Sequence, residues 1–233
     1  MLRPAVRYRR CACSGTTGAA ERFRLLQPSD GAAEERLLAR ARSGDLAAFN
    51  RLIEPHQRTL YAIAVRMLGD DPSAADVTQE SLLAAWQHVD SYHGGSFRAW
   101  LTRILVNRCY DVLRTRRRRP ERSYDAILAE QPESEQLAGE APDPEQLAVS
   151  SELGRHLSSG LSALPADQRA IVILCDVQGY SYAEAAEVEH ANVGTVKSRL
   201  SRGRARLRDW LAQRPELLPS GLRSHYSETK GRE

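Results

Sequence analysis

The densest group of side chains able to do chemistry lies near the C-terminal end, at residues 197–208. Six cationic residues fall within these positions, with no acid before Asp209: Lys197, Arg199, Arg202, Arg204, Arg206 and Arg208. Lysine and arginine pair with phosphate oxygens, and they also reach the O6 and N7 acceptors of guanine in the major groove. The hydroxyls of Thr195 and Ser198 can contact a phosphate or a base edge. The chemistry predicted for this segment is the binding of nucleic acid.

Two helices joined by a tight turn must position this cationic group. An alanine-rich amphipathic segment runs from Ser181 to about Val188, and a turn follows at 189–192. In the next segment apolar residues recur at helical spacing and predict one buried stripe: Val193, Val196, Leu200, Leu207 and Leu211. A helix pair whose second member is cationic, with hydroxyls at its start, is typical of a helix-turn-helix. The alternative is a solvated basic helix on an ordinary bundle.

The net charge of +3 over 233 residues conceals blocks of opposite sign. Arg114 and residues 116–119 form a basic run, whereas residues 121–150 hold 8 acidic side chains against Arg122 alone. These shifts divide the chain into five parts. They are a flexible basic arm at 1–33, a helical module at 34–119, a flexible acidic linker at 120–150, a second helical module at 151–213, and a polar tail at 214–233.

Apolar periodicity predicts helices throughout both modules, so the expected fold class is all-α, with two small helical domains. A break at residues 43–45 ends a first short helix, and Asp45 can cap a second helix at about 45–68. Because proline lacks an N–H group and crowds the preceding turn, we expect a kink or a break at Pro55.

The third and fourth helices of the first module are expected at about 74–90 and about 97–117. Two caps are open for the third helix: Asp71 with Pro72 at the first helical position, or Ser73 with Asp76 three residues on. A polar loop at 90–96 separates the two helices.

Composition argues against an enzyme, a metal site and a membrane protein. The 6 histidines are scattered, no glycine-rich nucleotide loop is present, and no nucleophile–base set can be identified, so no cofactor is expected. Cys11 and Cys13 have no completing ligands nearby, and Cys109 and Cys175 lie in apolar contexts that predict buried, inert thiols. The chain has neither a membrane-length apolar run nor the apolar core of a secretory signal, so we expect a cytoplasmic protein without membrane insertion.

Two sequence blocks, one in each helical module, resemble a known family. The first module contains DVTQESLLAAWQHVDSY at 76–92 and SFRAWLTRILVNRCYDVLRTRRRR at 96–119. The second contains LSALPADQRAIVILCDVQGYSYAEAA followed by GTVKSRLSRGRARLR. Over about residues 36–212 the chain resembles the extracytoplasmic-function (ECF, group 4) sigma factors of bacterial RNA polymerase. The resemblance implies a sigma region 2, a linker and a region 4 that together bind core polymerase, recognise −10 and −35 promoter elements and promote DNA opening.

An exposed polar face on the third helix is the expected contact with core polymerase. Spacings of three and four residues put Asp76, Gln79 and Glu80 on one face, with Leu82, Leu83 and Trp86 toward a different, core-facing side. In the family, the matching D-x-x-Q-E positions contact the coiled coil of the β′ clamp, and the resemblance implies that role here. Acids that favour the helix dipole are the alternative, chiefly for Asp76.

The loop at 92–96 and the fourth helix would form the surface that recognises and melts the −10 element. By resemblance, the loop holds a flipped base and the helix tracks the separated strand. The residues expected to contact −10 DNA are Tyr92, His93, Ser96, Arg98, Arg103, Asn107, Arg108 and Arg114. Residues 116–119 are further candidates for phosphates, and their alternative role is to favour the helix C-terminus.

The second module would read the −35 element through the turn-proximal part of its recognition helix. The expected contacts are Ser181, Tyr182, Thr195, Lys197, Ser198, Arg199 and Arg202. Glu189 and His190 stand where the family usually has an apolar residue and a turn glycine. A histidine in that turn needs a left-handed backbone, which is uncommon but tolerated.

The partners implied by the resemblance are core RNA polymerase, through its β′ clamp and β flap, promoter DNA, and an anti-sigma factor. A sigma factor in holoenzyme is associated with the nucleoid. The acidic linker either occupies a basic channel of the polymerase or serves as a soluble spacer. The rival function is a stand-alone helix-turn-helix transcriptional regulator, which would bind duplex DNA by itself.

Overall fold

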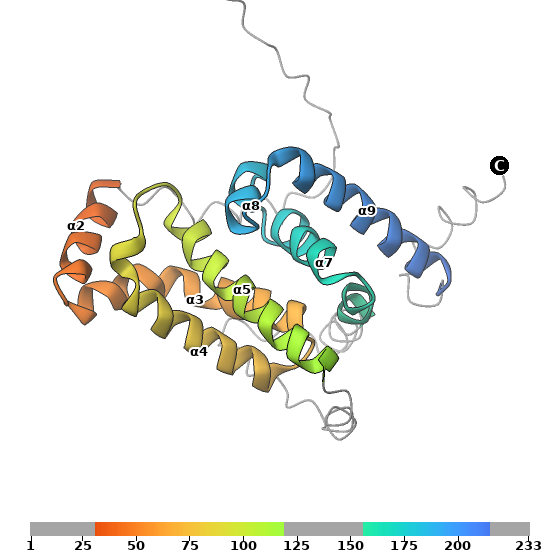
Figure 1. The fold of residues 1–233 in the computed structure, drawn as a ribbon, viewed down its shortest axis with the longest axis horizontal. Coiled ribbons are helices and arrows are strands. Elements are labelled where there is room, and N and C mark those ends of the chain that lie inside the picture. Colours follow the sequence, from red (N-terminus) through yellow and green to blue (C-terminus); the bar gives the residue numbers. More distant parts are fainter. Residues whose placement is uncertain (1–30, 119–155, 215–233) are drawn as a thin grey trace, which may run out of the picture.

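Helices make up both parts of the chain that the computed structural model describes, residues 31–118 and 156–214 (Figure 1). These are called the first module and the second module below. No strand occurs within the two ranges, in agreement with the expected all-α class. Of the expected arm, linker and tail, only residues 31–33 and 214 are described, and Cys11 and Cys13 lie outside the described residues.

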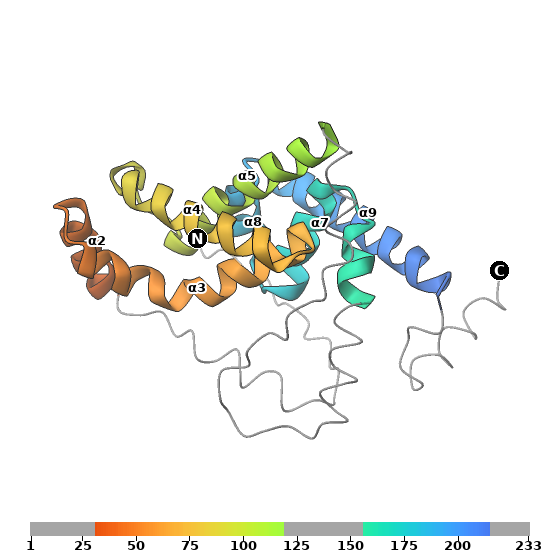
Figure 2. The same cartoon turned by 90° about the horizontal axis from the view of Figure 1, so that it is seen from below.

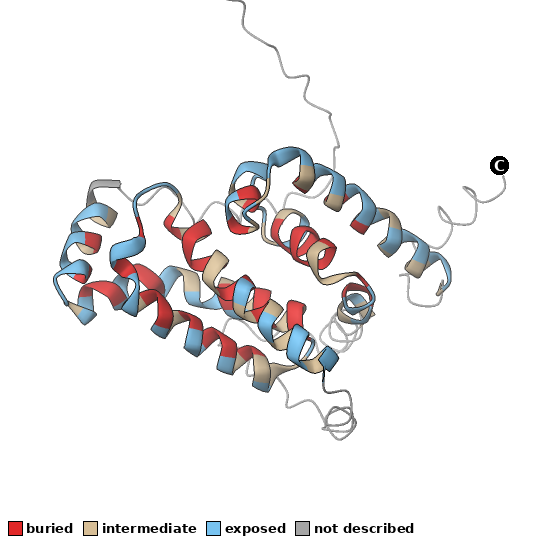
Figure 3. Cartoon of the chain, in the orientation of Figure 1, coloured by how far each residue is buried: buried red, intermediate tan, exposed pale blue. Residues whose placement is uncertain are grey.

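The first module is a bundle of four α-helices. Its elements are α2 (Gly31–Arg42), α3 (Leu46–Leu68), α4 (Asp71–Gln87), the 3₁₀ turn η2 (Val89–Ser91) and α5 (Phe97–Arg118). Helix α3 packs against α2, α4 and α5, and α4 also packs against α5 (Figures 1 and 2). Their buried side chains face one another, and the exposed ones line the outside of the bundle (Figure 3).

Helix α3 has the boundaries that its sequence predicts, but it is not broken. Asp45 is extended and its carboxylate accepts a hydrogen bond from the Ala48 amide at 3.0 Å, which confirms the predicted cap. The helix ends at Gly69, whose left-handed backbone (φ 84°) any side chain would strain. Of the kink or break expected at Pro55, the break does not occur, because one continuous helix runs from Leu46 to Leu68 with the proline inside it.

Helix α4 begins one turn earlier than predicted, because a different residue caps it. Asp70, in an extended conformation, accepts a 2.9 Å hydrogen bond from the Ser73 amide. Neither of the two caps expected from sequence, Asp71 or Ser73, is used. The guanidinium of Arg116, at the end of α5, contacts the same carboxylate at 2.7 Å. Asp70 therefore joins the ends of three helices: α3, α4 and α5.

The second module has a shorter set of helices. A helical stretch at 156–162 precedes α7 (Ala166–Val172), which continues directly into a π-helical turn, η4 (Ile173–Val177). Two further helices, α8 (Tyr182–Val188) and α9 (Val193–Ala212), follow, and α9 packs along α7 and α8 (Figure 1). In η4 the Gln178 amide donates to the Ile173 carbonyl, five residues back, at 2.9 Å.

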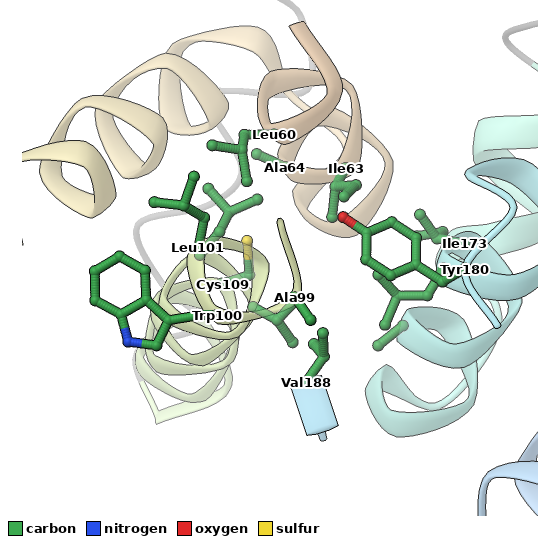
Figure 4. Packing of buried hydrophobic residues seen from close by; sticks show 14 of the residues in the cluster. Leu60, Ile63, Ala64, Ala99, Trp100, Leu101, Cys109, Ile173, Tyr180 and Val188 are labelled. Carbon is green, nitrogen blue, oxygen red and sulfur yellow. The ribbon is translucent and has the colours of Figure 1, made fainter. Parts of the chain in front are cut away.

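The two modules share one hydrophobic core. Leu60, Ile63 and Leu101 of the first module belong to the same buried cluster as Ile173 and Val188 of the second, and Figure 4 shows these side chains in the space between the helices of the two modules. Helix α5 packs on α8, and α3 packs on α7 and η4. The modules therefore lie against each other over a largely apolar surface, in which Thr102 of α5 is also buried.

Candidate nucleic-acid interface

The outer face of α4 presents all three residues predicted to contact the polymerase. Asp76, Gln79 and Glu80 are exposed, and the Glu80 carboxylate lies 2.9 Å from Arg108 of α5 in an ion pair open to solvent. Leu83, three residues beyond Glu80, belongs to the same face. The expectation that Leu83 points to the core is wrong, because 58% of it is exposed. Leu82 and Trp86 do pack against the core, as predicted.

Tyr92, predicted to contact −10 DNA, is a core residue. Only 5% of it is exposed, and its ring lies 5.4 Å from that of Phe97 and 5.6 Å from that of Trp100. Its hydroxyl donates to the Gly95 carbonyl at 2.8 Å and so closes the loop. In this structure the burial leaves its ring no face for a base, so we assign Tyr92 to the packing of the loop.

The rest of the loop borders a hollow between the two modules. His93 is exposed, and the Ser96 hydroxyl accepts from the Ala99 amide at 3.2 Å at the start of α5. The hollow has a volume of about 650 Å³, and residues from both modules line it, including Arg103 of α5, Glu187 of α8 and His190 of the turn. The predicted −10 loop and the helix-turn-helix are therefore neighbours.

The predicted DNA residues along α5 differ in what they contact. Arg98 forms a 3.1 Å ion pair with Glu184 of α8, and its guanidinium lies 3.8 Å from the centre of the Tyr180 ring. Arg114 pairs with Asp111 one turn away on the same helix. Arg103 lines the hollow and Asn107 is exposed, whereas Arg108 holds Glu80. The predicted DNA residues of α5 therefore lie in different surroundings, some paired with acids and others open to solvent or to the hollow.

Arg116 has a packing role that its basic context hides. Its guanidinium donates to the Leu68 carbonyl at 3.0 Å, to Asp70 at 2.7 Å and to the Ser73 hydroxyl at 2.6 Å. These contacts correct the expectation that Arg116 is available to neutralise phosphate.

The helix-turn-helix is formed by α8, a turn and α9. Ser181 caps α8 in a reciprocal capping box: the Glu184 amide donates to the Ser181 hydroxyl at 3.2 Å, and the Ser181 amide donates to the Glu184 carboxylate at 2.9 Å. Because the amide and the hydroxyl of Ser181 are both hydrogen-bonded to Glu184, the carboxylate of Glu184 occupies the N-terminus of α8. Tyr182 is 40% exposed.

The turn has the left-handed residue that the sequence predicts. His190 adopts a φ of 47°, and the Asn192 side chain then accepts from the Thr195 amide at 2.7 Å to start α9. Val196 and Leu200 are buried as expected, but Val193 is 39% exposed and is not part of the buried stripe. Val193 instead lines the hollow between the modules.

The exposed side of α9 carries most of the predicted −35 contacts. Lys197, Ser198 and Arg202 are exposed, and Lys197 lies 6.0 Å from the centre of the Tyr182 ring. Thr195 is half-buried, and its hydroxyl donates to Asn192 at 3.0 Å. Thr195, Lys197, Ser198 and Arg202 therefore lie in the first half of the recognition helix, and Tyr182 of α8 lies beside Lys197.

Arg199 differs from its cationic neighbours, because two acids hold it. It pairs with Glu189 at 3.0 Å and with Asp167 at 3.2 Å. The Glu189 side chain is only 4% exposed and also accepts from the Tyr110 hydroxyl of α5 at 2.8 Å. Burial raises the pKa of Glu189, although Tyr110 and Arg199 favour its charged form. Further along, Arg204 donates to Asp176 at 2.9 Å.

Sequence reasoning missed the residues that join the modules: Thr102, Tyr110, Tyr180, Glu184 and Glu189. Thr102 and Tyr180 are 0% and 3% exposed, and their hydroxyls lie 2.6 Å apart. The spacing of residues 98, 102, 106 and 110 along one face of α5 was the available signal, but it does not identify the partner.

Within residues 31–118 and 156–214, no cluster of histidine, cysteine or acidic side chains could hold a metal ion. No helix in the described part of the chain is long and apolar enough to cross a membrane. Burial raises the pKa of Cys109 to about 12 and that of Cys175 to about 11, so both thiols stay protonated near neutral pH. Cys109 is buried as predicted, whereas Cys175 is half-buried.

Comparison of sequences identifies two family regions in the predicted order. The model described as Sigma-70 region 2 matches residues 52–119, and that described as Sigma-70, region 4 matches residues 157–207. The ECF RNA polymerase sigma factor SigE of Mycolicibacterium smegmatis is 38% identical over 179 residues, which cover 73% of this chain and 65% of SigE. This chain therefore spans slightly less than two thirds of SigE. The ECF RNA polymerase sigma-E factor of Salmonella typhimurium is 38% identical over 180 residues, covering 76% of this chain and 93% of that protein.

Solved structures with a similar fold contain a bound partner. One is the sigma factor RpoE in complex with the anti-sigma factor NepR from Bartonella quintana, with 30% identity and a TM-score of 0.52 over 70% of this chain and 96% of that one. Another is CnrH in complex with the cytosolic domain of CnrY, with 28% identity and a TM-score of 0.56 over 78% of this chain and 99% of that one.

Proposed function

The chain belongs to the ECF RNA polymerase sigma factors, and we propose that it binds core polymerase through α4, contacts the −10 element through α5 and its loop, and reads the −35 element through α9. The observation that carries this proposal is the occurrence of both sigma regions, in order, with a polar face open on α4 and a cationic face open on α9. A stand-alone regulator is not favoured, because it would have no use for region 2.

The α4 face supports a protein contact by its composition. Asp76, Gln79 and Glu80 offer acceptors for a basic partner helix, and Leu83 adds an exposed apolar side chain beside them. The buried core of a protein interface is more apolar than its polar rim, so an exposed leucine among polar side chains suits the core of such a contact. We propose that this face contacts the β′ clamp of the polymerase, and that region 4 contacts the β flap.

The proposed roles in DNA binding follow from what each side chain contacts in this structure. His93, Arg103 and Asn107 are the −10 candidates open to solvent or to the hollow, and Ser96, Arg98, Arg108 and Arg114 must first exchange an existing partner. On α9, Lys197, Ser198 and Arg202 are open, with Thr195 and Tyr182 beside them. Ser181 and Arg199 are occupied by acids, so we propose that their direct contribution to −35 recognition is small.

No catalytic step is proposed for the chain itself. Opening of the promoter would draw its free energy from binding of the unpaired strand, since stacking of exposed bases and pairing of phosphates with cations both favour the melted DNA. We propose that the chain acts in the cytoplasm, and at the nucleoid when it is part of holoenzyme, because core polymerase and its template are found there. An anti-sigma factor is a further proposed partner, supported by the RpoE–NepR complex.

Transcription in vitro tests the proposal. Purified core polymerase on promoter fragments should start RNA synthesis only when this chain is added, and failure to bind core or to direct initiation would refute the function.

The variant Glu80→Lys should weaken core binding by at least about tenfold, because it reverses a charge in the contact. Leu83→Ala should weaken it too, without harming α4, since alanine favours a helix. Glu54→Lys, an equal charge change at an exposed position of α3, is the control. Core binding unchanged in both α4 variants would show that another surface makes the contact.

A further inference from the structure

The loop at 92–96 is fixed at its C-terminal end by hydrogen bonds within the first module. The Tyr92 hydroxyl donates to the Gly95 carbonyl at 2.8 Å, and the Ser96 hydroxyl accepts from the Ala99 amide at 3.2 Å. The second of these bonds also caps α5, because it satisfies an amide of the first helical turn. The last residues of the loop are therefore set by α5, the helix into which the loop leads.

The tip of the loop has a bent backbone and few neighbours. Gly94 and Gly95 have φ angles of 103° and 92°, in the left-handed region that other residues rarely adopt. No atom of the described residues lies within 4 Å of a Cβ built on either glycine. His93 is exposed beside them, and all three residues border the hollow. The position of the tip is therefore decided by the two ends of the loop and not by packing of the tip itself.

A residue of α2, Arg42, holds the beginning of the loop. Its Nη2 donates to the Tyr92 carbonyl, 50 positions further along the chain. Helix α2 packs on the 3₁₀ turn η2, which leads into the loop, so this bond joins two elements that already touch. Hydrogen bonds from a charged donor are roughly twice as strong as those between neutral groups. Arg42 thus ties the first α-helix of the module to the residue at which the loop begins.

The bonded carbonyl belongs to the peptide unit that joins Tyr92 to His93. Because a peptide unit is planar, fixing its oxygen also fixes the direction in which the chain continues into His93. The buried ring of Tyr92 is placed by the aromatic core, whereas the orientation of the peptide unit is placed by Arg42. A site that selects its ligand by shape must be held to about 0.5 Å, so the orientation of this unit bears directly on what the tip can accept.

The place of Arg42 in its own helix offers a second reason for a cation. Arg40 and Arg42 both stand in the last turn of α2, where a positive charge favours the helix dipole. The two arginines differ in their contacts, because Arg40 pairs with Asp45 at 2.6 Å and Arg42 bonds to the loop. A role in the dipole would be shared by both arginines, so an experiment can separate it from a role in the loop.

We propose that Arg42 is a positioning residue for base selection at the −10 element: without itself contacting DNA, it fixes the peptide unit from which the tip of the loop extends. This inference rests on the DNA-binding role proposed above for the loop. It gives a part in promoter specificity to α2, a helix that carries none of the predicted DNA contacts. The effect is local, because contacts with phosphates supply affinity without choosing a base.

Selection by the holoenzyme tests the proposal. Core polymerase with the full-length chain binds a pool of duplex fragments randomised over both promoter elements, and the fragments retained in open complexes are sequenced. Arg42→Met should lower the preference for one base at a single −10 position by at least about fivefold, since a recognised base pair is typically worth about 5-fold to 150-fold. Arg40→Met removes an equal charge from the same helical turn and should select as the wild type does. Arg42→Lys keeps the charge and a donor, so its preference should lie closer to the wild type than that of Arg42→Met.

Hydrogen exchange on the free full-length chain gives a readout that needs neither DNA nor polymerase. The amides of Ser91 and Tyr92 are hydrogen-bonded in the 3₁₀ turn that leads into the loop. They should exchange roughly tenfold faster in Arg42→Met, because one hydrogen bond that supports the turn is lost. They should be unchanged in Arg40→Met, and circular dichroism should report full helix content in every variant.

Each possible result bears on a different step of the reasoning. A preference in Arg42→Met that is unchanged, or weakened equally at all −10 positions, would overturn the positioning role while the proposed function stands. An equal loss in Arg40→Met would assign the effect to the helix dipole instead. Exchange that does not change in Arg42→Met would show that the bond does not hold the loop. A wild-type chain that directs no initiation would refute the proposed function and base selection with it, and the exchange result alone would then report whether Arg42 anchors the loop.

Discussion

A single methyl group added at Gly203 should loosen the recognition helix from its support. This buried glycine lies in the middle of α9, where α9 crosses α7. A Cβ atom built on it would lie 2.8 Å from Cγ2 of Val172 and 3.4 Å from the Gln168 carbonyl oxygen. Carbon atoms in ordinary contact are about 3.5–4.0 Å apart, so Gly203→Ala forces a displacement of roughly 1 Å.

The sign of the effect depends on two opposing terms. Alanine in place of glycine favours a helix by about 1 kcal/mol. Overpacking against a β-branched side chain that cannot turn away costs about 1–3 kcal/mol. The net effect expected is a loss of stability of up to about 2 kcal/mol, although the substitution improves helix propensity.

Gly194→Ala is the matched control, because it makes the same change in the same helix at an exposed position. The nearest atom to its added Cβ is Oδ1 of Asn192, at 3.2 Å, with no contact to α7. Hydrogen exchange with mass spectrometry, read on peptides of α7 and α9, should show amides exchanging roughly 5-fold to 150-fold faster in Gly203→Ala than in the control, which corresponds to about 1–3 kcal/mol. Equal or slower exchange in Gly203→Ala would refute the close-approach reasoning.

Two further predictions concern Asp70 and Lys197. Asp70→Ala should destabilise the first module by about 1–2 kcal/mol in thermal melts, through loss of a helix cap and a half-exposed ion pair, whereas Asp70→Asn keeps the cap. Burial raises the pKa of Asp70, but Ser73 and Arg116 lower it more, so the net pKa is lowered. The stability that the charged carboxylate adds is therefore present above the ordinary aspartate range and is lost as the pH falls through the lowered pKa. This pH dependence should be absent in Asp70→Asn. Lys197→Ala should weaken DNA binding and reduce the slope of log affinity against log salt by about 0.9, measured by titration over several salt concentrations. Arg204→Ala, which removes a cation already paired with Asp176, should change that slope less.

Melts of Asp70→Ala and Asp70→Asn that coincide at neutral pH would contradict the cap. An unchanged salt slope for Lys197→Ala would remove that residue from the phosphate contacts.

Local signals in the sequence predicted much of the fold. Asp45 and Gly69 have the caps and the backbone that their types favour, because each acts on its own helix end within a few residues. The predicted end of α5 lies within one residue of the observed end, and the turn at His190 has its predicted conformation. Asp70 shows where local reasoning fails: the two caps expected from the sequence, Asp71 and Ser73, are not used, and Arg116, 46 positions away from Asp70, contacts the residue that is.

The candidate sites were predictable to the extent that exposure follows from helical spacing. Asp76, Gln79 and Glu80 are exposed, whereas the Tyr92 ring packs against Phe97 and Trp100, a choice that spacing within a loop does not reveal. Leu83 is exposed although it is apolar, and such a departure from burial is visible only once the helix has been placed. The polar contacts between α5 and the second module pair residues about 80 positions apart, so no periodic pattern contains them.

The π-helical turn η4 has a consequence for how this stretch can change by insertion or deletion. Such a turn holds about one residue more than an α-helical turn, and each residue turns a helix by about 100°. Deleting one residue between Ile173 and Val177 would restore regular winding with little rotation of the segment that follows, because the extra residue and the wider turn nearly cancel. The wide turn thus accommodates one extra residue between α7 and the loop that bears Tyr180, without separating the Tyr180 hydroxyl from that of Thr102.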